Sequence, residues 1–150
     1  MAEIKNILFP VDFTSASKKV LPYVRYFVEK LEAKLVVIFV VEELSKYANF
    51  YVPHSALDNL EEEMIAAAEK KMANFVDEYM EDLSDVETIV KRGEVAEEIV
   101  KTAEEKNIDL IVMGTHGRKG LEKILLGSVA EQVIKRAPCP VMTVNPHYQK

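Results

Sequence analysis

The glycines of this chain are concentrated in one segment that could bind an anion. Of the five glycines in 150 residues, four lie between Gly114 and Gly127, and Ser128 follows. Glycine lets a backbone approach a phosphate closely and adopt positive φ angles. A flexible loop whose glycines only make turns is the alternative interpretation. The position of the cluster, between an apolar run and a helical pattern, favours phosphate binding.

A helix that begins at Ser128 would strengthen this prediction. Its first amides, on Gly127, Ser128 and Val129, would have no partner inside the helix and would point toward an anion. The Ser128 hydroxyl could add a hydrogen bond, and Arg118 and Lys119 bring positive charge within the segment. Two standard phosphate motifs are absent from the sequence, namely the P-loop and a GxGxxG after the first strand.

A single acidic residue, Asp12, follows the first apolar segment of the chain. Such a carboxylate can cap the next helix, or it can contact a ligand at the end of its strand. We expect ligand contact, because the segment before it is apolar enough to be a central strand.

The elements that must position these residues alternate along the chain. Apolar runs predict strands over residues 4–11, 35–41, 86–90, 110–113 and 141–144. Apolar residues at helical spacing predict four intervening helices, and Pro22 should make the first of them start late or bend. Alternating strands and helices indicate an α/β fold, a doubly wound parallel five-stranded sheet with helices on both faces. Ligands bind such sheets at the carboxyl ends of their strands.

Composition bounds the class of protein. The chain is 49% hydrophobic with a net charge of −6, so we expect one globular domain over residues 1–150 that binds neither nucleic acid nor membrane. Cys139 is the only cysteine, which excludes an internal disulfide and favours a reducing, cytoplasmic location. Between two prolines, Cys139 is expected to be a small buried apolar residue and not a nucleophile.

The glycine pattern Gly114-x2-Gly117-x9-Gly127-Ser128 resembles the nucleotide-binding motif of the universal stress protein family. Three further segments are similar to blocks of that family: Pro10-Val11-Asp12-Phe13, residues 109–114 and residues 137–141. The resemblance implies a Rossmann-like sheet with strand order 3-2-1-4-5, ATP as the ligand, and a homodimer.

The resemblance also implies roles for individual residues. Asp12 would contact the adenosine part, and Val40 or Val41 would offer backbone groups to adenine. Met113, Gly114 and Gly117 would flank the ribose and phosphates. The expected nucleotide-binding set is Pro10, Val11, Asp12, Val40, Val41, Met113, Gly114, Thr115, His116, Gly117, Arg118, Gly127, Ser128 and Val129.

The expected function is regulatory binding of ATP in a stress response, without catalysis. An enzyme needs a positioned base, and no carboxylate lies beside His116 in the sequence to orient it. His116 is therefore expected to be solvated or adjacent to phosphate. A slow ATP hydrolase or phosphotransfer enzyme is the alternative. Mg²⁺ could accompany ATP, held by phosphate oxygens, whereas His54 and His147 lack partners for a metal site built by the protein.

Three surface features complete the predictions. The last strand should lie at a sheet edge and pair two subunits through Val141, Met142, Thr143 and Val144. The aromatic residues Tyr47, Phe50 and Tyr51 could cover a bound base or pack on the sheet edge, with neither favoured. The run Glu61-Glu62-Glu63 is expected to be a solvated helix face. No motif identifies a protein partner.

Overall fold

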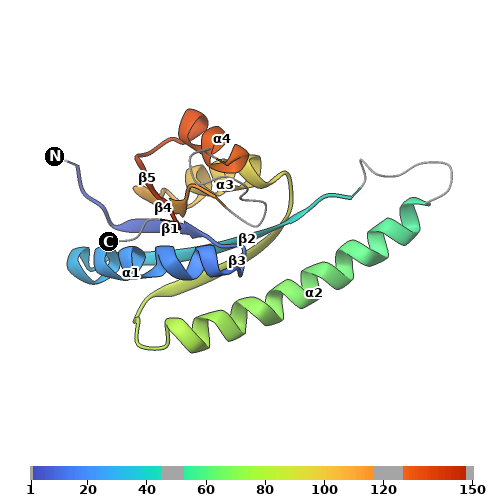
Figure 1. Cartoon of the computed structure of the whole chain (residues 1–150), viewed down its shortest axis with the longest axis horizontal. Coiled ribbons are helices and arrows are strands. Elements are labelled where there is room, and N and C mark those ends of the chain that lie inside the picture. Colours follow the sequence, from blue (N-terminus) through green and yellow to red (C-terminus); the bar gives the residue numbers. More distant parts are fainter. Residues whose placement is uncertain (1, 45–52, 117–126, 148–150) are drawn as a thin grey trace.

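The computed structural model describes residues 2–44, 53–116 and 127–147. It is one parallel sheet flanked by helices (Figure 1). The strands are β1 (Asn6–Pro10), β2 (Lys34–Glu42), β3 (Val86–Gly93), β4 (Leu110–Gly114) and β5 (Val141–Val144). The helices are α1 (Ser15–Leu31), α2 (His54–Tyr79), α3 (Val95–Glu105) and α4 (Ser128–Arg136). The sheet order β3-β2-β1-β4-β5 confirms the predicted topology.

Two apolar cores hold the three layers together. One lies between the sheet and helices α1 and α2, around Phe9, Val24 and Phe75. The other lies between the opposite face of the sheet and helices α3 and α4, and includes Ile99 and Val133. The strands β1, β2 and β4 are mainly apolar because both faces of a parallel sheet are covered. Among the described residues, no helix is both long and apolar enough to cross a membrane.

Helix α1 begins at Ser15, so the predicted late start at Pro22 is wrong. Pro22 is exposed and lies within the helix. It removes one helical hydrogen bond, and its ring crowds the carbonyl four residues earlier. Burial of one face of α1, including Val20 and Val24, outweighs that loss.

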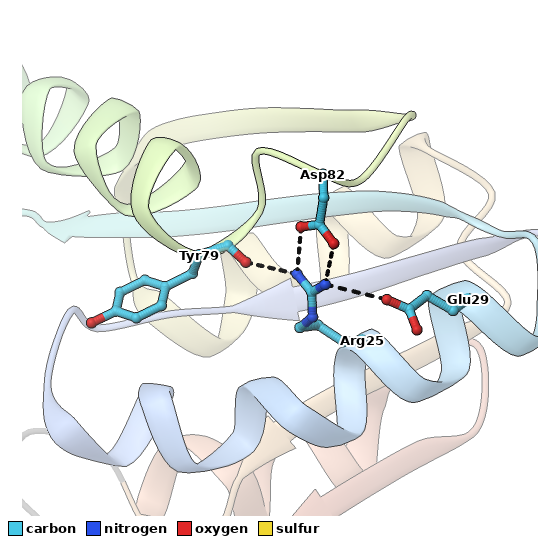
Figure 2. Close-up of polar contacts among 4 residues, drawn as sticks. All are labelled: Arg25, Glu29, Tyr79 and Asp82. Atoms are coloured by element: carbon cyan, nitrogen blue, oxygen red, sulfur yellow. Dashed lines mark hydrogen bonds and ion pairs between the residues drawn. The ribbon is translucent and has the colours of Figure 1, made fainter.

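Arg25 ties α1 to the end of α2 (Figure 2). Its guanidinium donates to the Tyr79 carbonyl at 2.8 Å and to both carboxylate oxygens of Asp82, Oδ1 at 3.0 Å. A fourth hydrogen bond reaches Glu29, the third partner residue, at 3.2 Å. The hydrogen bond with Asp82 raises the pKa of Arg25, and the same bond lowers the pKa of Asp82. The contact fixes where the long helix α2 ends relative to α1.

Glu61 is buried, so the prediction of a solvated run is wrong for this residue. One carboxylate oxygen accepts a hydrogen bond from the Leu44 amide. The other pairs with Arg92 Nη1 at 3.0 Å, which supplies the opposite charge that a buried carboxylate needs. Glu62 and Glu63 are exposed as predicted. The buried Glu61 fastens α2 to the carboxyl ends of β2 and β3.

Candidate functional site

At the carboxyl edge of the sheet, β1 stops before its neighbour β2. β1 ends at Pro10, which pairs with Ile38, while β2 continues to Glu42. On the other side of β1, β4 ends at Gly114. The strand order reverses between β1 and β4, because β2 and β3 follow on one side and β5 on the other. This is the topological switch point at which open α/β sheets bind ligands.

The register of β2 distinguishes Val40 from Val41. Residues of a strand turn their N–H and C=O groups alternately to the two neighbouring strands. Leu35 and Glu43 donate toward the β3 side, to Asp85 and Gly93, whereas the carbonyl of Ile38 accepts from Val11 on the β1 side. Val40 therefore turns its backbone groups toward the space beyond β1, and Val41 turns its groups toward β3.

Asp12 organises the turn that leaves β1. Its Oδ1 accepts hydrogen bonds from the Thr14 amide at 3.0 Å, the Thr14 hydroxyl at 2.6 Å and the Ser17 hydroxyl at 2.8 Å. The Ser17 hydroxyl also accepts from the Asp12 amide at 3.0 Å. These bonds fix the orientation of the carboxylate, so the helix-start role and a ligand role are compatible at this residue.

Sequence reasoning missed the part that Ser17 and Phe13 play in this turn. Phe13 has φ +62°, an uncommon value for a residue with a side chain. Its ring packs on Phe39 at 4.7 Å and on Phe75 at 6.0 Å between ring centroids. Because Phe13 has the left-handed conformation, the chain turns and brings Thr14 and Ser17 within hydrogen-bonding distance of Asp12. The available signal was the hydroxyl spacing after Asp12.

Thr115 joins the two ends of the glycine segment, Gly114 and Gly127. The Thr115 amide donates to the Val144 carbonyl at 2.9 Å, and its carbonyl accepts from the Gly127 amide at 2.8 Å. A Cβ on Gly127 would lie 2.7 Å from that same carbonyl oxygen. Gly127 has φ −64°, which any residue adopts, so the requirement for glycine here is steric. The junction brings the end of β4 against the start of α4.

Helix α4 presents its N-terminus at this junction. The N-cap is Gly127, which has no side chain to cap the helix, and Ser128 is exposed. The first amides of a helix lack intrahelical partners and favour an anion. The predicted start of α4 at Ser128 is confirmed, and its first turn lies at the carboxyl edge of the sheet. The prediction that the Gly127 amide points toward an anion is wrong, because this N–H donates to the Thr115 carbonyl at 2.8 Å.

His116 is buried, with 7% of its surface exposed, so the expectation of a solvated side chain is wrong. Its Nδ1 lies 2.8 Å from the Thr115 hydroxyl. Its ring meets that of His147 edge to face, with centroids 5.4 Å apart. Pattern analysis could not find this burial, because His147 comes from the segment after β5.

The remaining predicted site residues divide into three groups. Val41 and Met113 are buried within the sheet, and Val11 is buried just after β1, so their side chains belong to the core that supports this edge. Pro10 and Val129 are half-buried beside it. The predictions for Gly117 and Arg118, and for the aromatic residues Tyr47, Phe50 and Tyr51, fall outside the described residues.

Cys139 is half-buried and packs against the second core. Burial and the nearby charge of Asp109 raise the pKa of its thiol, which disfavours the reactive thiolate. In the part of the chain that the structure describes, no three His, Cys, Asp or Glu side chains form a metal-ligand group.

Comparisons with known proteins agree on one family. The model of the universal stress protein family matches residues 3–145. Universal stress protein MJ0531 of Methanocaldococcus jannaschii is 37% identical over 143 residues, covering 94% of this chain and 82% of the relative. Universal stress protein MJ0577 of the same organism is 34% identical over 154 residues, covering 94% of each.

Solved structures share the fold. The structure of MJ0577 superimposes with a TM-score of 0.82 at 33% identity, covering 95% of this chain and 96% of that one. A universal stress protein from Archaeoglobus fulgidus in complex with dAMP has a TM-score of 0.64 at 20% identity, covering 95% and 98%. The family match and the relatives both span nearly the whole sequence, and the chain belongs to the universal stress protein family.

Proposed function

We propose that this protein binds ATP at the carboxyl edge of its sheet and acts as a regulatory member of the universal stress protein family. The observation that carries the proposal is that three polar features converge at the topological switch point between β1 and β4. They are the Asp12 turn after β1, the outward-facing backbone of Val40, and the Thr115–Gly127 junction that exposes the start of α4. We assign one part of a nucleotide to each of these three features.

The phosphates fit the start of α4. Glycine at position 127 keeps the backbone close to the end of β4, and the amides of Ser128 and Val129, which have no acceptor inside the helix, follow it. Amides of this kind attract anions. Mg²⁺ would accompany the phosphates without a ligand group of the protein's own.

The adenine base fits the backbone of Val40. An adjacent N–H and C=O pair can donate to N1 of adenine and accept from its N6 amino group. Guanine presents an acceptor, O6, where adenine presents that donor, so it would face the Val40 carbonyl with the wrong group. We therefore propose selectivity for ATP over GTP. The dAMP complex of the Archaeoglobus fulgidus protein supports the idea that this fold can hold an adenine nucleotide.

We propose binding without rapid turnover. A general base is normally oriented by a hydrogen-bonded partner such as a carboxylate. Among the described residues, His116 Nδ1 has the Thr115 hydroxyl as its hydrogen-bond partner, and not a carboxylate. Slow hydrolysis through electrostatic stabilisation at the helix start is the second reading.

We also propose a cytoplasmic homodimer. β5 lies at the edge of the sheet next to β4, and its four residues are all half-buried. An unpaired strand edge can continue the sheet into a second copy through Val141, Met142, Thr143 and Val144.

The test of ATP binding uses the purified protein directly. Denaturation followed by chromatography identifies any nucleotide carried from the cell, and calorimetry on nucleotide-free protein compares ATP with GTP. We expect ATP to bind and GTP to bind much more weakly. Equal affinity for both would overturn the assigned role of Val40, and no binding of either would overturn the proposed function.

A further inference from the structure

The strand β3 forms the edge of the sheet opposite β5, and among the described residues its outer side has no partner strand. Leu35 in β2 donates to the Asp85 carbonyl, and Glu43, just after β2, donates to the Gly93 carbonyl. The odd-numbered residues of β3 therefore face β2. Because backbone groups alternate between the two sides of a strand, the even-numbered residues turn their N–H and C=O groups away from the sheet. These residues are Val86, Thr88, Val90 and Arg92.

This edge lacks the features that usually prevent another strand from pairing. β3 has eight residues, whereas β5 at the other edge has four. Native proteins protect long edges with proline, with charged side chains or with a covering element. β3 contains no proline, and its charged residues Glu87, Lys91 and Arg92 are all engaged in ion pairs with neighbouring elements. The middle of β3, where Thr88 is exposed, can therefore accept an added strand.

A groove of about 260 Å³ lies beside this edge, between α2 and β3, and is lined by Glu69, Met72, Thr88 and Val90. An apolar cavity of about 150 Å³ can hold benzene, so this groove has room for one long side chain. Met72 is buried and gives the groove an apolar wall, whereas Glu69 is exposed. A strand added along Thr88 and Val90 would place every second side chain on the α2 face of the sheet, next to the groove.

The unpaired charge at the groove is negative. In the part of the chain that the structure describes, no ion pair involves Glu69. Its neighbours three and four positions away on α2, where a helical ion pair would form, are all uncharged: Ile65, Ala66, Met72 and Ala73. Glu62 lies two turns earlier on the same side of α2 and is exposed as well. Pairing β3 with β3 of a second copy would bring these carboxylates together, and like charges oppose that contact.

We propose that the β3 edge and this groove bind an extended segment of a partner protein that carries lysine or arginine between β-branched residues. The backbone of the segment pairs with the outward groups of Val86, Thr88 and Val90. Its basic side chain enters the groove along Met72 and meets the carboxylate of Glu69. The site is separate from the carboxyl edge between β1 and β4, so this proposal and the proposed nucleotide binding stand or fall independently.

The test uses the full chain and two synthetic peptides with blocked ends, the basic TVKVKVT and the acidic TVEVEVT. Amide hydrogen exchange followed by NMR reports on each N–H of β3. We expect TVKVKVT to slow exchange at Val86, Thr88 and Val90, whereas Glu87 and Ile89 are already protected by β2 in the free chain. No slowing at millimolar TVKVKVT, or equal slowing by TVEVEVT, would overturn the proposal.

A charge reversal in the groove has a matched control on the same helix. Glu69→Lys and Glu63→Lys change the net charge equally, and Glu63 is exposed on a different side of α2. Loss of one exposed ion pair predicts that Glu69→Lys binds TVKVKVT about fivefold more weakly, with a gain in affinity for TVEVEVT. Glu63→Lys should leave both affinities close to those of the wild type. Equal effects of the two substitutions would contradict the role of Glu69.

Thr88→Pro removes one outward N–H without touching the hydrogen bonds to β2, and proline is tolerated on edge strands. Circular dichroism should show a folded protein, and calorimetry should show that it no longer binds TVKVKVT. Retained peptide binding in folded Thr88→Pro would overturn the strand pairing, and if this variant does not fold, Glu69→Lys decides. Light scattering covers the other occupant, because an assembly of the wild type that Thr88→Pro dissociates would show that β3 pairs two copies of the chain, contrary to the proposal.

Discussion

Gly127→Ala tests the junction between β4 and α4 with the smallest possible change. The new Cβ would lie 2.7 Å from the Thr115 carbonyl oxygen, a distance that real side chains do not tolerate. The neighbour is backbone, so relief requires the start of α4 to move away from the end of β4. That movement stretches the 2.8 Å hydrogen bond from the Gly127 amide to the same carbonyl.

The expected magnitude follows from these two effects. Overpacking of this kind costs about 1–3 kcal/mol, and the hydrogen bond contributes about 1 kcal/mol of that range when it is weakened. For a domain of this size, about 2–4 °C of melting temperature accompany each kcal/mol. We expect the melting temperature of Gly127→Ala to fall by about 3–10 °C. Displacement of the α4 amides should weaken ATP binding by at least about tenfold, equivalent to about 1.4 kcal/mol.

The assay pairs thermal unfolding with calorimetric titration of ATP, and Gly93→Ala is the matched control. Gly93 has φ +156° at the end of β3, so alanine is strained there as well, but the position is away from the α4 junction. We expect Gly93→Ala to lose stability while retaining its ATP affinity below the melting transition. Wild-type ATP affinity in Gly127→Ala would refute the steric argument for the junction.

Three further predictions concern assembly, pH and turnover. Thr143→Pro removes the backbone N–H of residue 143, which β5 could donate to a second copy. Light scattering should report a shift from dimer to monomer. A wild-type monomer at micromolar concentration would rule out the assembly. The hydrogen bond from Arg25 lowers the pKa of Asp82 in the folded protein, so the Asp82 carboxylate stabilises the fold. This stabilisation is fully present above the unfolded pKa of about 3.9 and disappears as the pH falls through the lower folded pKa. The substitution Asp82→Asn removes it at every pH. Urea unfolding of wild type and Asp82→Asn should therefore differ at neutral pH and converge in acid, and a constant difference would contradict this. Phosphate release from ATP should be far below about 10 per second, and rapid Mg²⁺-dependent release would favour an enzyme.

The fold could be predicted from local sequence because the strands β1, β2 and β4 are mainly apolar runs. Residues Ile7, Leu8 and Phe9 are fully buried, as their pattern indicates, and the strand order expected from the family resemblance is the one observed. Strand ends were less predictable. β3 extends to Gly93, beyond the apolar stretch, because its backbone pairs with β2 as far as Glu42.

The details of the site depend on partners distant in sequence. Glycine 127 was correctly placed at the start of a helix, but the atom that requires it is the carbonyl of Thr115. The burial of Glu61 depends on Arg92 from another element, and that of His116 involves His147. No local pattern carries such contacts, so the sequence predicts a solvated Glu61 and a His116 that is solvated or adjacent to phosphate.

The most direct test of the account is a backbone amide NMR map of the ATP site. Nucleotide-free protein is titrated with ATP, and each shift is placed on the sheet. We predict the largest changes at Asp12, Val40, residues 114–116 and residues 127–129, with little change at the opposite edge near Lys34. Shifts concentrated elsewhere, for example between α2 and β3, or no shifts at millimolar ATP, would contradict the claim that this edge is a nucleotide site.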